Sequence, residues 1–195
     1  MNAVIVSDVD ERLPEAFIKN WLKNASQHLV EKKLISPEQK ALEVSLVFLK
    51  EGEAKRLNWK YRGKDYPTDI LSFENEDHES LGELVFCWNV LQRQAKEHKL
   101  PLEQELGYLM IHGLLHLLGH DHEVPGPQAE KMLGLQDEIF EQMVTQTKKK
   151  QSVQKKVGMK ADTSKKVSGK KLKKSGKSVK SPSKPALKAV KTKKR

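Results

Sequence analysis

A break in composition near residue 147 divides the chain into a part that can bury a core and a part that cannot. All eleven aromatic residues precede the break, and the last of them is Phe140. Residues 1–147 hold 16 Lys and Arg against 25 Asp and Glu, whereas residues 148–195 hold 20 Lys and Arg against one acid. A segment without large apolar side chains cannot offset the conformational entropy lost on folding. We therefore expect residues 1–147 to form one domain and residues 148–195 to be a disordered Lys-rich tail.

Cysteine content and hydropathy narrow the class of protein further. The single cysteine, Cys87, excludes an intramolecular disulfide and fits a reducing cytoplasm, and we expect its thiol to be buried at the end of a strand. No apolar run approaches the roughly 20 residues that a membrane-spanning helix requires. The first eight residues contain no basic segment of the kind that begins a signal peptide. These features predict a cytoplasmic protein with no membrane partner.

The spacing of apolar residues predicts an α+β fold. Alternating or strand-forming runs predict strands, and apolar residues three and four apart predict helices. The predicted strands are residues 3–6, 42–49, 69–73 and 84–88, and the predicted helices are residues 14–34, 51–61, 90–98, 102–118 and 128–145. Because strands and helices do not alternate in a strict βαβ rhythm, we expect a mixed sheet of about four strands packed with about five helices.

Three histidines give the strongest chemical signal. His112 and His116 are four residues apart on a predicted helix, so both project from one face. Gly119 tolerates positive φ and lets the chain turn back, so His122 can return as a third ligand. Three neutral imidazoles bind Zn²⁺ and leave one coordination position for water, which is typical of a catalytic site. We therefore predict one zinc ion per chain, held by these three residues.

The neighbours of these histidines limit what the site can do. The spacing is similar to that of the metzincin proteases, but their general base, a Glu directly after the first His, is replaced here by Gly113. A peptidase would lack its base, so we exclude that activity. Asp121 either orients a ligand imidazole or only forms the turn after the helix. His120 is expected to point away from the other three, and the histidines expected to be ordinary surface residues are His28, His78 and His98.

A short basic segment gives the second signal. Residues 55–64 contain five basic residues and no acid, and Trp59 and Tyr61 interleave with the charges. Single-stranded nucleic acids are commonly held by phosphate contacts to Arg and Lys and by base stacking on aromatic rings. The alternative is a solvated helix face whose aromatic residues lie in the core, and this segment alone does not choose between the two. The candidate RNA-binding residues are Lys60, Arg62 and Lys64.

Together these segments resemble the YbeY family of bacterial single-strand-specific, metal-dependent endoribonucleases. The resemblance rests on NWKYR (58–62) leading into PTDILSF (67–73), on LGELVFC (81–87) and on HGLLHLLGHDH (112–122). It covers most of residues 1–147 and none of the tail. It implies that His112, His116 and His122 bind zinc, that Arg62 is catalytically important, and that the fold is a small mixed sheet with helices. It also implies action on the 3′ end of 16S rRNA and in ribosome quality control, with rRNA, the small ribosomal subunit and ribosomal proteins as partners.

The residues support a mechanism in outline. Zinc lowers the pKa of bound water and polarises a phosphoryl oxygen, and Arg62 can grip the phosphate through two hydrogen bonds. We therefore expect His116 and Arg62 to be catalytic, while the general base and the choice between water and the RNA 2′-hydroxyl as nucleophile stay open. One alternative is a non-catalytic ribosome assembly factor whose zinc only closes the fold, with a fourth protein ligand such as His120. Another is a hydrolase of some other small substrate, which would need a deep pocket.

The tail raises a separate expectation, because residues 1–147 are net negative and RNA is a polyanion. The Lys-rich residues 148–195 can act as a salt-sensitive tether that adds affinity for RNA without sequence choice. A competing interpretation is that the tail folds back on the acidic domain and masks it.

Overall fold

The structure is a computed structural model that describes residues 1–75, 80–122 and 125–161, with side chains up to residue 147. His78 therefore lies outside the described residues. The helices and strands are, in chain order, β1 (Asn2–Ser7), α1 (Glu15–Glu31), the short 3₁₀ helix η1 (Gln39–Ala41), β2 (Glu43–Leu49), α2 (Glu51–Arg62), β3 (Ile70–Glu74), β4 (Ser80–Cys87), α3 (Trp88–His98), α4 (Leu102–Leu117) and α5 (Pro127–Ala161). The predicted α+β class is confirmed.

The four described strands form one mixed sheet in the order β1-β2-β4-β3. β1 pairs with β2 and β2 with β4 in parallel, whereas β3 and β4 are antiparallel. In this register Phe48 lies opposite Phe86, and their rings stack with centroids 5.1 Å apart. Side chains alternate between the two faces of a strand, so this row of large residues defines the face of the sheet that is buried in the core.

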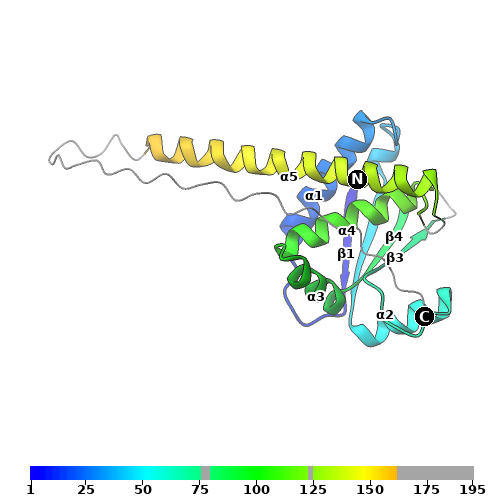
Figure 1. Cartoon of the computed structure of the whole chain (residues 1–195). Coiled ribbons are helices and arrows are strands. Elements are labelled where there is room, and N and C mark those ends of the chain that lie inside the picture. The colour runs from blue at the N-terminus through cyan, green and yellow to red at the C-terminus, as the bar shows by residue number, and fades with distance from the viewer. Residues whose placement is uncertain (76–79, 123–124, 162–195) are drawn as a thin grey trace. The chain divides into compact units, whose positions relative to one another are not determined.

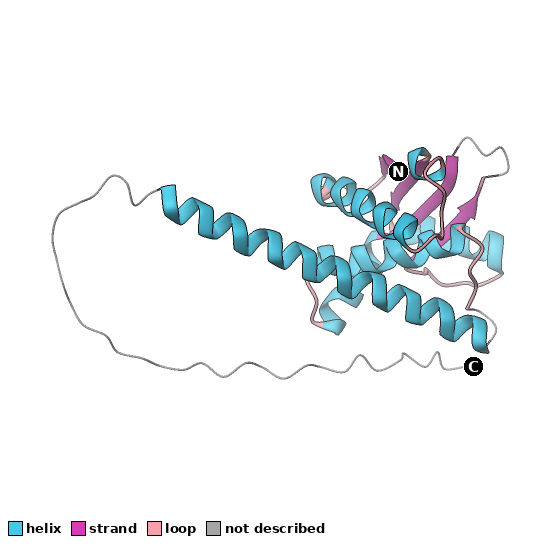
Figure 2. Ribbon diagram, turned by 90° about the horizontal axis from the view of Figure 1, so that it is seen from above, coloured by secondary structure: helices cyan, strands magenta, loops and turns pink. Residues whose placement is uncertain are grey.

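Helix α4 packs on this core face and is the helix that positions the site. Ten of its sixteen residues are buried, so it is apolar on almost every side, as a central helix must be. A Cβ atom at Gly113 would lie 2.6 Å from Leu84 Cδ2 and 2.7 Å from Ile70 Cδ1, which shows how closely the helix approaches β3 and β4. Trp21 of α1 donates a hydrogen bond from Nε1 to the Gly107 carbonyl at 2.9 Å and fixes α1 against α4. Figure 1 shows α4 beside the strands, and Figure 2 shows the strands gathered in one layer.

Helices α2 and α3 meet at the end of β4. Cys87 follows Phe86 and so faces the other side of the sheet, where it forms a small buried cluster with Ala54 and Val90. The prediction of a buried thiol at a strand end is confirmed, and burial raises the pKa of the Cys87 thiol. This cluster holds α2 in place beside the sheet.

Helix α5 carries the predicted apolar stripe and then continues beyond it. Met132, Ile139 and Met143 are buried as expected. The helix runs to Ala161, however, and the compact unit of the chain ends at Gln154. This differs from the expected disordered tail at residues 148–161, because lysine and glutamine are good helix formers and this stretch contains no proline. The second unit, Lys155–Arg195, is described only as far as Ala161, and the assignment of separate functions to residues 1–147 and 148–195 stays a prediction.

No helix in the described part of the chain is long and apolar enough to cross a membrane.

Candidate metal centre

The chain reverses direction after α4 and returns beside the last two turns of that helix. Gly119 has a φ of +78°, in the left-handed region that glycine adopts without steric cost. The Gly119 amide donates to the His116 carbonyl at 2.8 Å, and the His120 amide donates to the Leu115 carbonyl at 3.0 Å. These two bonds are those of a Schellman motif, which satisfies helix carbonyls that would otherwise lack partners. The turn predicted from Gly119 is therefore present.

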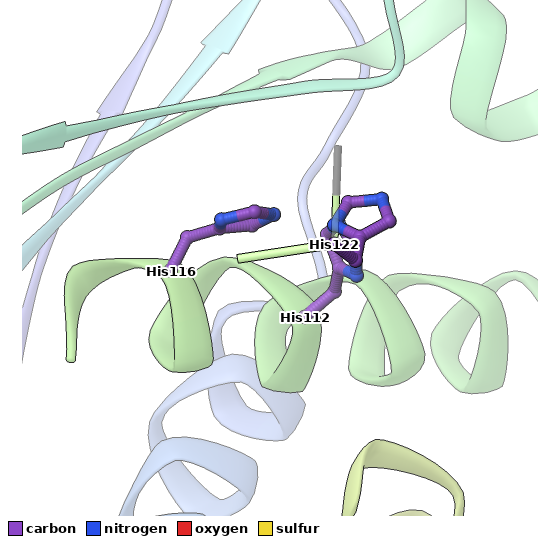
Figure 3. A group of neighbouring side chains, drawn as sticks. All are labelled: His112, His116 and His122. Atoms are coloured by element: carbon purple, nitrogen blue, oxygen red, sulfur yellow. The ribbon is translucent and has the colours of Figure 1, made fainter. Parts of the chain in front are cut away.

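This turn brings three imidazole rings together beside α4. The ring centroids of His112 and His116 are 4.7 Å apart, those of His112 and His122 are 4.7 Å apart, and those of His116 and His122 are 5.0 Å apart. Figure 3 shows that His112 and His116 project from the same side of the helix and that the ring of His122 joins them. One nitrogen from each ring can be chosen so that all three lie within 4.8 Å of one another.

A buried glutamine from a distant helix holds the first of these rings. The Nδ1 atom of His112 lies 2.9 Å from Oε1 of Gln136, whose side chain is only 1% exposed. An amide oxygen can only accept, so His112 donates from Nδ1 and its Nε2 keeps the lone pair. Gln136 was not among the residues predicted from the sequence, where its only signal is a polar residue four positions after Met132 on the buried stripe of α5.

The environment of the rings favours their neutral form. Burial, with smaller contributions from His112 and His122, lowers the pKa of His116 to about 4. Burial and the neighbouring His112 also lower the pKa of His122, and the positive charge of Arg62 acts in the same direction. At neutral pH both imidazoles are therefore uncharged and able to offer a lone pair.

The donor set fits a zinc ion. Zinc takes neutral imidazole nitrogens in tetrahedral sites, and all three rings are partly buried, as expected for a metal site open to a substrate. The buried Nδ1 of His122 has no hydrogen-bond partner among the described residues, and an unpartnered polar atom in such a cluster is suited to a ligand role. Only these three residues form such a group within residues 1–75, 80–122 and 125–147, and His120 does not belong to it.

Three charged residues, Arg62, Asp69 and Asp121, act electrostatically on the histidine rings. Arg62 lowers the pKa of His122 and Asp69 raises it, so both charges act on that ring. Burial lowers the pKa of both His116 and His122, and the negative charge of Asp121 opposes this effect in part. Sequence reasoning missed Asp69, whose carboxylate accepts hydrogen bonds from the Ile70 amide at 2.9 Å and from Gln94 Nε2 at 2.9 Å. The catalytic role of Arg62 and the orienting role of Asp121 stay predictions.

The basic segment lies on the C-terminal half of α2 and the loop that follows it. Lys60, Arg62 and Lys64 are all exposed, as phosphate-binding residues must be. The interpretation that put the aromatic residues of this segment in the core is wrong, because Trp59 and Tyr61 are exposed as well. The side of α2 that packs inward is lined instead by small or polar residues, namely Ala54 and Asn58.

Gly113 shows why the metzincin spacing does not carry metzincin chemistry here. The position that holds the catalytic Glu in those proteases faces Leu84 and Ile70 rather than the cluster. A glutamate there would meet the core face of the sheet. The structure thus agrees with the exclusion of a peptidase.

One of the remaining histidines departs from its prediction. His28 was expected at the surface but is only 5% exposed, because it lies three residues after Ala25 on the buried side of α1. His98 is exposed as predicted, and its Nδ1 lies 3.0 Å from the carboxylate of the buried Glu105. Neither ring contributes to the three-histidine group.

The family model and the two relatives that match this chain carry the same family name, and one solved structure is similar to it. The family model described as Endoribonuclease YbeY matches residues 5–144. Endoribonuclease YbeY of Bdellovibrio bacteriovorus is 47% identical over 141 residues, covering 72% of this chain and 94% of that protein. Endoribonuclease YbeY of Persephonella marina is 34% identical over 149 residues, covering 72% of this chain and 92% of that protein. The solution structure of TM1509 from Thermotoga maritima is similar with a TM-score of 0.51 and 31% identity, covering 75% of this chain and 93% of that one.

Proposed function

Because the chain belongs to the YbeY endoribonuclease family, we propose that it is a zinc-dependent endoribonuclease that cleaves single-stranded RNA. We further propose that it acts in the cytoplasm on the 3′ end of 16S rRNA, in small-subunit maturation and ribosome quality control, with the small subunit and its proteins as partners. The observation that carries the proposal is the cluster of His112, His116 and His122 with Arg62 acting on it, all within the matched residues.

Each residue has a distinct task in this proposal. The three histidines would hold one Zn²⁺, which supplies Lewis-acid activation of a phosphoryl oxygen and lowers the pKa of a bound water. Gln136 fixes the His112 tautomer through its hydrogen bond to Nδ1. The exposed guanidinium of Arg62 can contact a phosphate with two parallel hydrogen bonds and offset the negative charge that grows in the transition state. The negative charge of Asp121 acts on His116 and His122, and in this proposal Asp121 would orient a ligand imidazole and offset part of the charge of the zinc ion.

The alternative of a non-catalytic assembly factor requires a closed zinc site with a fourth protein ligand. Within the described residues the group contains three histidines, and His120, the candidate for a fourth ligand, is outside it. Three ligands support the catalytic interpretation over the structural one.

Cleavage of single-stranded RNA by the purified protein, with its zinc content, tests the proposal. We expect His116→Ala to lose both zinc and activity, and Arg62→Ala to keep zinc but lose activity by about 100- to 1,000-fold, the usual effect of removing one transition-state hydrogen-bond donor. Matched controls are His120→Ala and Arg93→Ala, the latter removing an exposed arginine of α3 that forms an ion pair with Glu51 at the start of α2. Both controls should cleave normally.

Full activity in both His116→Ala and Arg62→Ala would contradict the assignment. Zinc bound by wild type without any RNA cleavage would favour the assembly factor. Mapping the ends of 16S rRNA in a deletion strain tests the choice of substrate, because unprocessed 3′ ends are expected only if the chain acts there.

A further inference from the structure

Three exposed aromatic residues lie together in the short stretch that also contains Arg62. Six large apolar side chains in the described part of the chain are exposed, and all the aromatic ones among them fall between residues 59 and 66. Trp59 is 64% exposed, Tyr61 is 55% exposed and Tyr66 is 54% exposed. Large aromatic rings usually lie in the core of a protein, so three exposed rings within eight residues indicate a binding surface.

The stretch is held in a fixed conformation rather than left as a loose loop. The buried side chain of Asn58 donates from Nδ2 to the Tyr66 carbonyl at 2.7 Å, which ties the loop after α2 back to the helix. Lys55 pairs with Asp65 across the same turn at 3.1 Å. Gly63 ends the helix with a φ of +66° and donates to the Trp59 carbonyl at 2.9 Å. The surface is therefore preorganised before any partner binds, which lowers the entropic cost of binding.

Charge and ring geometry show what kind of partner fits. The segment 55–64 carries five basic residues and no acid, although residues 1–147 as a whole are net negative. Lys60 Nζ lies 4.9 Å from the centre of the Tyr61 ring, and that ring is supported edge-on by Phe73 at 4.9 Å. Cations interleaved with exposed rings suit a strand that offers phosphates and unpaired bases together. A duplex offers only phosphates, because its bases are already stacked.

We propose that Trp59, Tyr61 and Tyr66 form a base-stacking surface that holds single-stranded RNA beside the three histidines and selects against duplex. This inference rests on the proposed function, since it places the strand at that site. The Tyr61 ring packs on Phe73 of β3, and Ile70 of the same strand lies against Gly113, the residue after His112. Arg62 follows Tyr61 directly on α2. A strand whose bases stack on α2 would thus present a phosphate to Arg62.

Binding of a base-containing strand and an abasic strand distinguishes stacking from simple charge attraction. The probe is a short fluorescein-labelled 2′-O-methyl oligouridylate, which lacks the free 2′-hydroxyl, and its partner is an abasic strand of equal length and charge. Affinities are measured by fluorescence anisotropy with the zinc-loaded full chain.

We expect Trp59→Ala and Tyr66→Ala each to weaken binding of the oligouridylate by about 5- to 150-fold, the usual loss for one base–aromatic stack. Binding of the abasic strand should stay unchanged, and Trp59→Phe should restore most of the loss. Lys60→Gln should weaken binding of both the oligouridylate and the abasic strand, and it should reduce the slope of log affinity against log salt concentration by about 0.7. The matched controls Leu133→Ala, another exposed apolar residue, and Lys23→Gln, an exposed lysine of α1, should bind both strands as wild type does.

Two results would overturn the inference. One is an equal loss for both strands in Trp59→Ala and Tyr66→Ala, and the other is wild-type affinity for the oligouridylate in both variants. Cleavage of unmodified RNA by wild type, measured in parallel, separates this failure from that of the proposed function. A wild type that cleaves RNA, with base-independent binding, refutes only the stacking surface. Binding that depends on these rings, without cleavage, supports the surface and refutes the nuclease assignment.

Discussion

Replacing Gln136 with leucine tests whether a residue of α5 controls metal binding by histidines of α4. The Gln136 side chain is 1% exposed, and its Oε1 accepts the Nδ1 proton of His112 at 2.9 Å. Leucine has a similar size and no acceptor, so Gln136→Leu removes the hydrogen bond without opening a cavity. In the metal-free protein the partly exposed His112 ring can turn and find water. If Nε2 were bound to zinc, the ring could not turn, and its Nδ1–H group would stay without an acceptor. Gln136→Leu should therefore destabilise the zinc-bound protein more than the metal-free protein.

The expected loss of affinity follows from leaving the Nδ1–H group of His112 against a leucine side chain that cannot accept its hydrogen bond. Leaving such a donor without a partner costs about 1–3 kcal/mol. Since each 1.4 kcal/mol is a factor of ten, we expect zinc affinity to fall by about 5- to 150-fold. Loss of a hydrogen bond to a metal-bound histidine typically weakens metal affinity by about 10- to 100-fold, which agrees.

The assay is competition for zinc against a chromophoric chelator, with urea unfolding of the metal-free protein as a second measurement. Gln136→Glu keeps an acceptor and should bind zinc at least as tightly as wild type. Gln142→Leu removes an exposed glutamine that donates to Glu138 on the same helix and should change nothing. A Gln136→Leu variant that binds zinc as tightly as wild type, with unaltered metal-free stability, would refute this role of Gln136.

Three further predictions concern packing, pH and the tail. Gly113→Ala should lower the free energy of unfolding by about 1–3 kcal/mol in urea titration, because its methyl group would press into the sheet. Gly134→Ala, on open helix surface, should raise the free energy of unfolding by about 0.5–1 kcal/mol. Equal effects of the two substitutions would contradict the close packing of α4 on the sheet. The pKa of His116 is about 4 in the folded protein and about 6.5 unfolded, so the unfolded chain binds the extra proton first, and the metal-free protein should lose stability as pH falls from 6.5 toward 4. His116→Gln, which cannot take up that proton, should lose less thermal stability over that interval, and parallel curves would refute the shift. Truncation after Ala161 removes 14 Lys and Arg and one acid while sparing α5. RNA binding should then weaken and its salt dependence should flatten, while short RNA is still cleaved. An unchanged dependence of RNA affinity on salt would exclude the tether, and raised cleavage activity at low salt would favour masking by the tail.

Prediction from sequence succeeded where the relevant interactions are local in the chain. The spacing of His112 and His116 places them on one face of any α-helix, and Gly119 permits the turn that returns His122. The order of strands and helices also follows from local periodicity. The end of α5 was missed because apolar periodicity stops near Thr145, whereas the helix continues to Ala161 through residues that favour helix without needing a core.

What the tertiary structure decided concerns pairs of residues far apart in the chain. Gln136 meets His112 only because α5 packs against α4. A glutamine on an apolar stripe does not by itself indicate which residue it bonds. The segment 55–64 left two interpretations open, because helical spacing does not say which side of a helix faces the core. The packing of Ala54 against Cys87 turned the small side of α2 inward and left Trp59 and Tyr61 in solvent. The sequence by itself thus determined the three histidines and the turn that gathers them. Packing between distant segments determined their hydrogen-bond partner and the exposed rings beside them, because burial depends on the whole fold.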